Sequence, residues 1–143
     1  MTLEIPALAV TLPIVGVPLD ESGWDVTWLG GEAGYLQGSA FPTWAGNTVI
    51  TAHVWDAANN PGPFARLKDL KYGERFYIHA WGRTYIYEVR SNQLVRPEDT
   101  AALLKRENLD WVTLFTCEGY NEPGQTYAYR RVVRAVLVAV ANE

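Results

Sequence analysis

Short runs of valine, isoleucine, threonine and aromatic residues recur along the whole chain. Such runs are typical of β-strands, and clusters of glycine, proline and asparagine separate them where turns are expected. The runs that we expect to form strands are residues 8–15, 49–52, 75–80, 84–94, 111–115 and 132–140. Many short strands with few helices predict an all-β fold, either a sandwich or a closed barrel.

One α-helix is expected, over about residues 97–105. Pro97 is tolerated in a first helical turn, and Glu98 and Asp99 place acidic groups at the amino end, where the helix dipole favours them. A shorter helical turn is expected near residues 64–67. The chain therefore combines a sheet with one or two short helices.

Composition favours one domain that can bury a core. The chain has 143 residues, of which 48% are hydrophobic and 13% aromatic. The net charge is −4, and the basic residues form no patch of the kind that phosphate binding requires. This composition argues against nucleic acid as the main partner.

Cys117 is the single cysteine. It has no second thiol to pair with and no Cys or His cluster with which to share a metal, so it is a candidate nucleophile. A thiol reacts as its thiolate, which usually needs a nearby histidine. The alternative is a buried structural cysteine, because free cysteines are often buried and inert.

Two histidines could serve Cys117. His53 ends a β-branched run, Thr48-Val49-Ile50-Thr51, and is expected at the rim of a sheet, where a substrate can reach it. His79 lies within the alternating run 75–80 and is expected to face outward from a strand. The pattern therefore favours His53.

The residues around Cys117 resemble a known family. Thr113-Leu114-Phe115-Thr116-Cys117 resembles the TLxTC signature of sortases, and residues 47–53 resemble the strand that leads to the catalytic histidine of that family. Further likeness lies in residues 3–6, 64–74 and 95–99, in the family's order, so that the resemblance covers about Leu3 to Val140. It implies a closed sortase-type β-barrel of about eight strands. Residues 40–42 and 47–56 are more similar to sortase classes D and E than to class C.

The resemblance also implies an arginine near the cysteine. Arg130 and Arg131 are both candidates, and adjacent strand residues face opposite sides of a sheet, so only one can serve. The register of Arg130 to Ala135 fits the family with Arg130 as the functional residue and Arg131 as the alternative. Thr116 is expected to contact the substrate or its oxyanion through its hydroxyl or backbone amide, or else to be a strand residue only.

In the mechanism that the resemblance implies, Cys117 attacks a carbonyl of an LPxTG-like sorting signal and forms a thioacyl-enzyme. His53 protonates the leaving amine and later deprotonates an incoming amine, while Arg130 stabilises the negative oxygen. The partners are then a sorting-signal peptide of surface proteins and an amine acceptor, either a cell-wall peptide or a pilin lysine. No cofactor and no metal is expected, because the acidic residues lack a ligand-spaced series. Nothing in the sequence requires more than a monomer.

The family resemblance implies a location at the extracellular face of the bacterial cell membrane. No apolar stretch of about 18 residues or more, the length that a membrane span requires, is present, and no signal-peptide pattern follows Met1. We therefore expect residues 1–143 to be a single soluble catalytic domain whose natural membrane anchor is not part of this sequence.

The sequence leaves two other interpretations to compare with this one. Other cysteine enzymes fit less well, because the papain-type and caspase-type motifs are absent, as are the histidine and glycine that an L,D-transpeptidase shows close before its cysteine. The alternative from a different class is a noncatalytic extracellular β-domain that binds peptide or carbohydrate and has a structural cysteine.

Overall fold

The computed structural model describes residues 1–21, 23–55, 60–96, 98–99, 101, 107–121 and 126–143, with the backbone alone at 117–121 and 126–128. Its strands are β1 (Thr2–Ile5), β2 (Val10–Val17), β3 (Leu19–Asp20), β4 (Gly23–Trp24), β5 (Ala33–Leu36), β6 (Gly46–Thr51), β7 (Arg75–Ala80), β8 (Arg83–Val95), β9 (Asp110–Asn121) and β10 (Thr126–Asn142). These described residues also form two 3₁₀ turns, η1 (Pro6–Leu8) and η2 (Leu67–Asp69).

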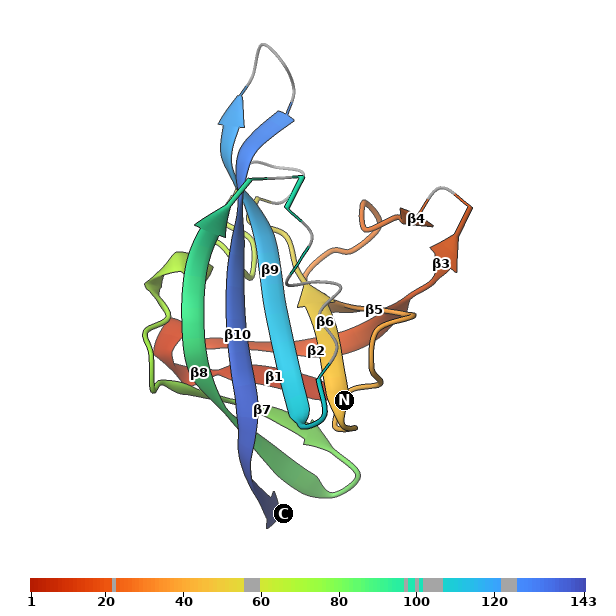
Figure 1. Ribbon diagram of the computed structural model, residues 1–143, viewed down its shortest axis with the longest axis vertical. Helices are drawn as coiled ribbons and strands as arrows, with labels where there is room; N and C mark the ends of the chain where they lie inside the picture. The colour runs from red at the N-terminus through yellow and green to blue at the C-terminus, as the bar shows by residue number, and fades with distance from the viewer. Residues whose placement is uncertain (22, 56–59, 97, 100, 102–106, 122–125) are drawn as a thin grey trace.

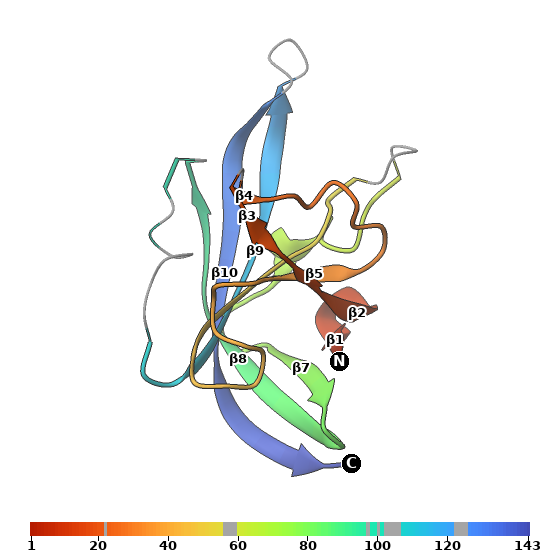
Figure 2. The ribbon, with the colours of Figure 1, turned by 90° about the vertical axis from the view of Figure 1, so that its right-hand side faces the viewer.

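Eight of these strands form a closed barrel in the order β1-β2-β5-β6-β9-β10-β8-β7 (Figure 1). The short strands β3 and β4 pair with each other outside it. In both views β9 and β10 run side by side and continue beyond the other barrel strands (Figure 1; Figure 2). The predicted all-β fold and the closed barrel of about eight strands are therefore confirmed.

The predicted strand ends agree with the structure to different degrees. Residues 75–80 form β7 with the predicted ends, whereas β9 extends to Asn121. β5 was missed because it is short and contains Gly34, which ordinarily weakens a strand. A Cβ at Gly34 would lie 2.7 Å from Val17 and 2.8 Å from Leu29, so close packing requires this glycine.

The helix predicted over residues 97–105 falls largely on residues outside the described part of the chain. The helical turn predicted near residues 64–67 lies directly before η2 and overlaps it only at Leu67, whose N–H donates to the carbonyl of Phe64 at 3.1 Å. η1 was not predicted. It starts at Pro6, which suits a first helical position because it lacks an N–H group, and Ala9 follows it with a positive φ of 55°.

Alternation along β9 divides its hydrophobic side chains between two clusters, and barrel-facing residues of β10 belong to the first of them. Leu114 and Val133 belong to the barrel core, which also contains Ile50, Phe76 and Tyr87. A second set, which we call the outer cluster, consists of Val17, Leu29, Leu36 and Val49. Phe115 packs against this outer cluster and is half-buried. Because β9 is apolar on both faces, its neighbours hold it from the inside and the outside of the barrel.

A buried carboxyl lies at the start of β9, inside the barrel. Tyr87 is fully buried, and its hydroxyl donates to both carboxylate oxygens of Asp110, at 3.1 Å and 3.0 Å. Burial raises the pKa of Asp110 from 3.8 to about 6, against the lowering effect of the Tyr87 hydrogen bonds. Burial, followed by the nearby Asp110 charge, also raises the pKa of Tyr87. At neutral pH the barrel therefore contains a poorly solvated negative charge.

The free energy of unfolding of Asp110→Asn is expected to increase relative to that of the wild type as the pH rises. The folded wild type binds more protons than the unfolded chain between about pH 4 and pH 6, so its free energy of unfolding falls across that window and stays lower above it. The uncharged amide lacks this penalty, and the stability difference should shift by roughly 1–3 kcal/mol between about pH 4 and pH 7.5. Urea denaturation at both pH values measures the shift. A stability difference between the two proteins that is the same at both pH values would contradict the prediction.

Candidate active site

The ladder between β9 and β10 places Cys117 and Arg130 directly opposite each other. The next pairs are Arg131 with Thr116 and Val132 with Phe115. Directly opposite positions of an antiparallel pair belong to the same face of the sheet. Positions 117 and 130 are therefore neighbours across two strands.

β6 brings His53 toward the same end of β9. β6 and β9 are parallel, and Thr51, the last residue of β6, pairs with Phe115. His53 follows Thr51 by two residues, as Cys117 follows Phe115. β6, β9 and β10 are adjacent strands of the barrel (Figure 1). Of the four predicted site residues, the backbone register therefore brings His53, Cys117 and Arg130 to one end of these strands.

Two threonine hydroxyls fasten the end of β6 to β9. The Thr51 hydroxyl donates to the carbonyl of Phe115 at 2.9 Å, and the Thr116 hydroxyl donates to the carbonyl of Ala52 at 3.4 Å. Each bond crosses from one strand to the backbone just before a predicted site residue. The segment that leads to His53 is thus tied to the segment that leads to Cys117.

The side chain of Thr116 is not placed for the expected contact with substrate, because it points away from the outer face of β9. The side chain is buried, and its hydroxyl makes the bond to Ala52. Thr116 alternates with Phe115, so its side chain lies on the barrel face of β9, together with Leu114. A contact between substrate and the backbone amide of Thr116 remains a prediction.

A glycine in the next loop supports the backbone of His53. The N–H of Phe64 donates to the His53 carbonyl at 3.0 Å, and Gly62 lies against the same carbonyl. A Cβ at Gly62 would lie 2.3 Å from that oxygen, so any side chain would displace one of the two segments. Gly62 belongs to one of the glycine, proline and asparagine clusters that predict turns, and the sequence does not reveal this contact because it depends on tertiary structure.

Arg130 is half-buried and lies against an aromatic ring. Its guanidinium carbon is 5.3 Å from the centre of the Phe115 ring. Its Nε is buried and, within the described part of the chain, has no hydrogen-bond partner. The ring contact thus holds the guanidinium near position 117, and no ion pair with Arg130 occurs among the described side chains.

Arg131 belongs to a different set of contacts. Its Nη1 donates to the side-chain oxygen of Asn92 at 3.2 Å, and the amide of Asn92 donates in turn to the carbonyl of Leu70 at 2.7 Å and to that of Leu67 at 3.2 Å. Arg131 therefore helps to fasten η2 and its flanking residues to the barrel. These contacts favour Arg130 over Arg131 as the arginine beside the cysteine.

A cavity of about 340 Å³ lies beside Arg130, over the outer faces of β8 and β10. The residues that line it include Ser91, Gln93, Val95, Asp99, Val132 and Arg134. Val95 pairs directly with Arg130, and Val132 is two residues farther along β10. The cavity therefore continues the face that carries Arg130, on the side away from His53.

Arg134 anchors the far wall of this cavity. Its guanidinium carbon is 4.6 Å from the centre of the Trp111 ring, and its Nε donates to the hydroxyl of Thr113 at 3.3 Å. Its Nη2 lies 3.3 Å from a carboxylate oxygen of Glu107, an ion-pair distance without hydrogen-bond alignment. The Thr113 hydroxyl donates to the side-chain oxygen of Asn47 at 2.6 Å. This network spans β6, β9 and β10.

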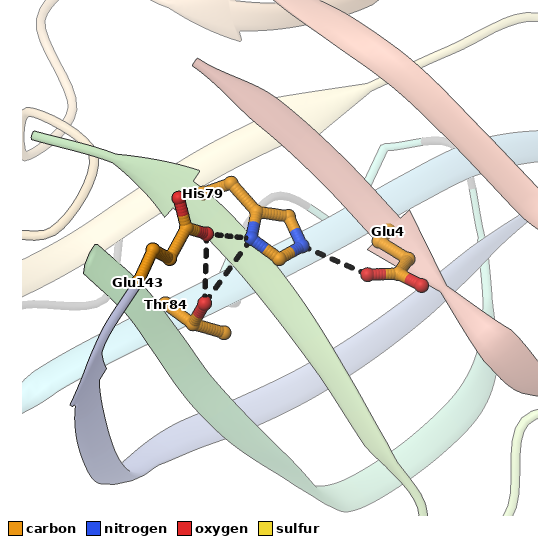
Figure 3. A network of polar contacts seen from close by, with 4 residues as sticks. All are labelled: Glu4, His79, Thr84 and Glu143. Carbon is orange, nitrogen blue, oxygen red and sulfur yellow. Dashed lines mark hydrogen bonds and ion pairs between the residues drawn. The ribbon is translucent and has the colours of Figure 1, made fainter. Parts of the chain in front are cut away.

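His79, the alternative histidine, lies at the opposite end of the barrel strands in a polar cluster (Figure 3). Its Nε2 is 2.8 Å from a Glu4 carboxylate oxygen, and its Nδ1 contacts Glu143 and the Thr84 hydroxyl. The hydrogen bond with Glu4, followed by the one with Glu143, raises the pKa of His79. The hydrogen bond with His79, followed by the one with Thr84, lowers the pKa of Glu143. His79 thus joins β1 and the end of β10, and the described contacts give it a structural role.

His79→Asn is expected to leave activity unchanged and to flatten the pH dependence of stability. Because the folded-state pKa of His79 is raised, its stabilising effect is complete below its ordinary value of 6.5 and is lost as the pH rises through the folded-state value. The cluster is partly exposed, so the wild-type melting temperature should fall by only about 2 °C more than that of the variant between about pH 6 and pH 8.5. Thermal melts of both proteins test this. A cleavage assay that loses activity in His79→Asn would overturn the structural role.

Neither a metal centre nor a membrane-spanning helix occurs in the described residues. No three His, Cys, Asp or Glu side chains among them lie close enough together to hold a metal ion. No helix in that part of the chain is both long and apolar enough to cross a membrane.

Comparison with known proteins places the chain beside sortases. Residues 3–138 match the family model of the sortase domain. Sortase A from Corynebacterium diphtheriae, in a lid-mutant form, is 36% identical with a TM-score of 0.77, over 96% of this chain and 69% of that chain. A second structure of that enzyme is 35% identical with a TM-score of 0.78, over 96% of this chain and 60% of that chain. A search of curated protein sequences found no significant match.

A third solved structure, sortase C-1 from Actinomyces oris, is 31% identical with a TM-score of 0.77, over 96% of this chain and 72% of that chain. The chain thus spans 60–72% of the length of the three solved structures, and in one of them less than two thirds. These three are sortases A and C, and a Clostridium perfringens sortase D5 matches at 22% identity with a TM-score of 0.75, which shows the fold alone, so likeness to class D or E stays a prediction. The family match over residues 3–138 and the common fold lead to one conclusion: the chain belongs to the sortase family.

Proposed function

We propose that residues 1–143 form a sortase catalytic domain in which Cys117, His53 and Arg130 carry out transpeptidation. The observation that supports this most strongly is the backbone register, which sets position 117 opposite position 130 while β6 delivers His53 to the same end of β9. A cysteine transpeptidase needs a thiol, a proton carrier and an oxyanion donor within reach of one carbonyl. Those three groups are available at this end of the barrel.

The first half of the reaction forms a thioester. The Cys117 sulfur attacks the scissile carbonyl, and the carbonyl π electrons move to oxygen, where the Arg130 guanidinium stabilises the negative charge. Collapse of this intermediate restores the carbonyl and breaks the C–N bond. His53 gives its proton to the leaving nitrogen, so the downstream segment departs as a neutral amine.

The second half forms the new amide. An amine acceptor attacks the thioester carbonyl, His53 accepts a proton from the attacking nitrogen, and the C–S bond breaks to release the Cys117 thiolate. The same charge develops on the carbonyl oxygen, so Arg130 acts again. Water in place of the amine ends the cycle as hydrolysis.

The positions of His53 and the cavity indicate how a peptide would lie. Because His53 protonates the leaving amine, the downstream part of the signal should extend toward β6. The acyl part should then cross β10 toward β8, where the cavity beside Arg130 can receive a side chain. The distance from the β9 strand to β8 is about two strand spacings, or roughly 10 Å, which an extended peptide covers in about three residues. An LPxTG-like signal is the peptide to test first.

The partners and location follow from the proposed reaction and the family. The substrates are a sorting-signal peptide of a surface protein and an amine, either a cell-wall peptide or a pilin lysine. The reaction would take place at the extracellular face of the bacterial membrane, to which the full protein would be anchored.

A peptide-library cleavage assay with and without candidate amines tests this function. Wild-type protein should release the downstream fragment and, with the right amine, form a ligated product of the corresponding mass. Supplying an LPxTG peptide with oligoglycine or with a lysine-bearing peptide separates the two acceptor classes. Absence of both cleavage and ligation across the library, in protein shown to be folded, would favour the noncatalytic β-domain instead.

A further inference from the structure

We propose that Phe115 is a positioning residue for Arg130: its ring face holds the guanidinium in place, and the outer cluster holds the ring. This inference rests on the proposed function, because it assigns Phe115 a task in the same reaction. It also gives a purpose to a second hydrophobic cluster outside the barrel core.

The contact between the two side chains is direct. Phe115 pairs with Val132 in the ladder, two residues along β10 from Arg130. The guanidinium carbon lies 5.3 Å from the ring centre, within the range of a cation–π interaction. The Arg130 Nε is buried without a hydrogen-bond partner in the described part of the chain, and such desolvation strengthens attraction to the ring.

The Phe115 ring is itself held in place. It also packs against the outer cluster of Val17, Leu29, Leu36 and Val49. The space left by Gly34 allows Val17 and Leu29 to pack closely, because a Cβ there would lie within 3 Å of both. The Thr51 hydroxyl fixes the Phe115 carbonyl at 2.9 Å. The backbone and the ring of Phe115 are therefore both restrained.

A ring suits this task better than a carboxylate. A carboxylate would also orient a guanidinium, but its negative charge would compete with the developing oxyanion for the same donors. No described side chain forms an ion pair with Arg130. By contrast, Arg134, four residues farther along the same face of β10, is paired with Glu107. The face of Phe115 holds Arg130 through the ring quadrupole and leaves its full charge for the substrate.

Fluorination of Phe115 tests the inference without changing the shape of the site. Phenylalanine analogues with one, two and three ring fluorines weaken the negative ring face step by step and change the ring volume little. We expect kcat to fall progressively, by about 3- to 10-fold across the series, with KM and the melting temperature nearly constant. The same analogues at Phe76, a fully buried ring of the barrel core, serve as the matched control and should leave kcat unchanged.

Two results separate this inference from the proposed function. If the wild type is active but kcat does not change across the fluorinated Phe115 series, the positioning role is wrong and the transpeptidase proposal stands. The same conclusion follows if fluorination lowers kcat by the same factor when Arg130 is present and when it is replaced by alanine. If the unmodified protein neither cleaves nor ligates any peptide, the proposed function itself fails. Phe115→Leu, which keeps an apolar side chain without a ring, should lower kcat at least as much as the trifluorinated analogue.

Discussion

Replacing Cys117 by alanine is expected to abolish both cleavage and ligation, with a loss of about 10⁴-fold or more in turnover. The sequence has no second cysteine, so no other thiol can form the thioester. Turnover of a labelled sorting peptide measures the loss. Intact-mass analysis of the wild type, quenched during turnover, should show the added acyl mass, and Cys117→Ala should show none.

Reactivity of the thiol provides the control for this prediction. An activated cysteine should react with a thiol probe at mildly acidic pH, where a buried ordinary thiol is nearly inert. His53→Ala should slow the labelling and His79→Asn should not, because His79 lies in the separate cluster with Glu4 and Glu143. Cleavage by Cys117→Ala at the wild-type rate, or a wild-type thiol that does not label, would support the structural cysteine instead.

The fold was predictable where sequence alone determines a strand. The run from Arg75 to Ala80 alternates and ends before a turn at Gly82, and it is β7 with the predicted ends. β5, unlike β7, was not predicted from the sequence. Its Gly34 allows Val17 and Leu29 to pack closely, and local strand propensity cannot reveal such a tertiary requirement. The extension of β9 and β10 likewise depends on their pairing with each other through residues that include turn formers.

The sequence was enough to name the residues of the candidate site, but not to predict which faces of the strands they occupy or which residues they contact. Arg130 and Arg131 are adjacent, and only the ladder register and the Asn92 bond show that Arg130 lies opposite Cys117 while Arg131 contacts Asn92. The contact between Thr51 and Phe115 joins residues 64 positions apart, so no local pattern contains it. Phe115 fills the variable position of the TLxTC signature, where the resemblance alone assigns no task.

Arg130→Lys is expected to lower kcat/KM by about 10²- to 10³-fold while the protein stays folded. Lysine keeps the positive charge, but it loses the planar donor fork that can meet an oxyanion with two hydrogen bonds. It also loses the flat guanidinium that lies against the Phe115 ring, so its ammonium would not be held at the same point. Steady-state kinetics with a sorting peptide and an amine acceptor measure the effect.

Arg131→Lys is the matched control, because it makes the same chemical change one residue away. Arg131 donates to Asn92 on the barrel side of the ladder, so its replacement should cost about 1 kcal/mol of stability and change kcat/KM less than about 3-fold. The two variants thus separate catalysis from stability between neighbouring positions. A large activity loss in Arg131→Lys together with a nearly active Arg130→Lys would reverse the assignment, and it would mean that the arginine serving Cys117 comes from the other face of β10.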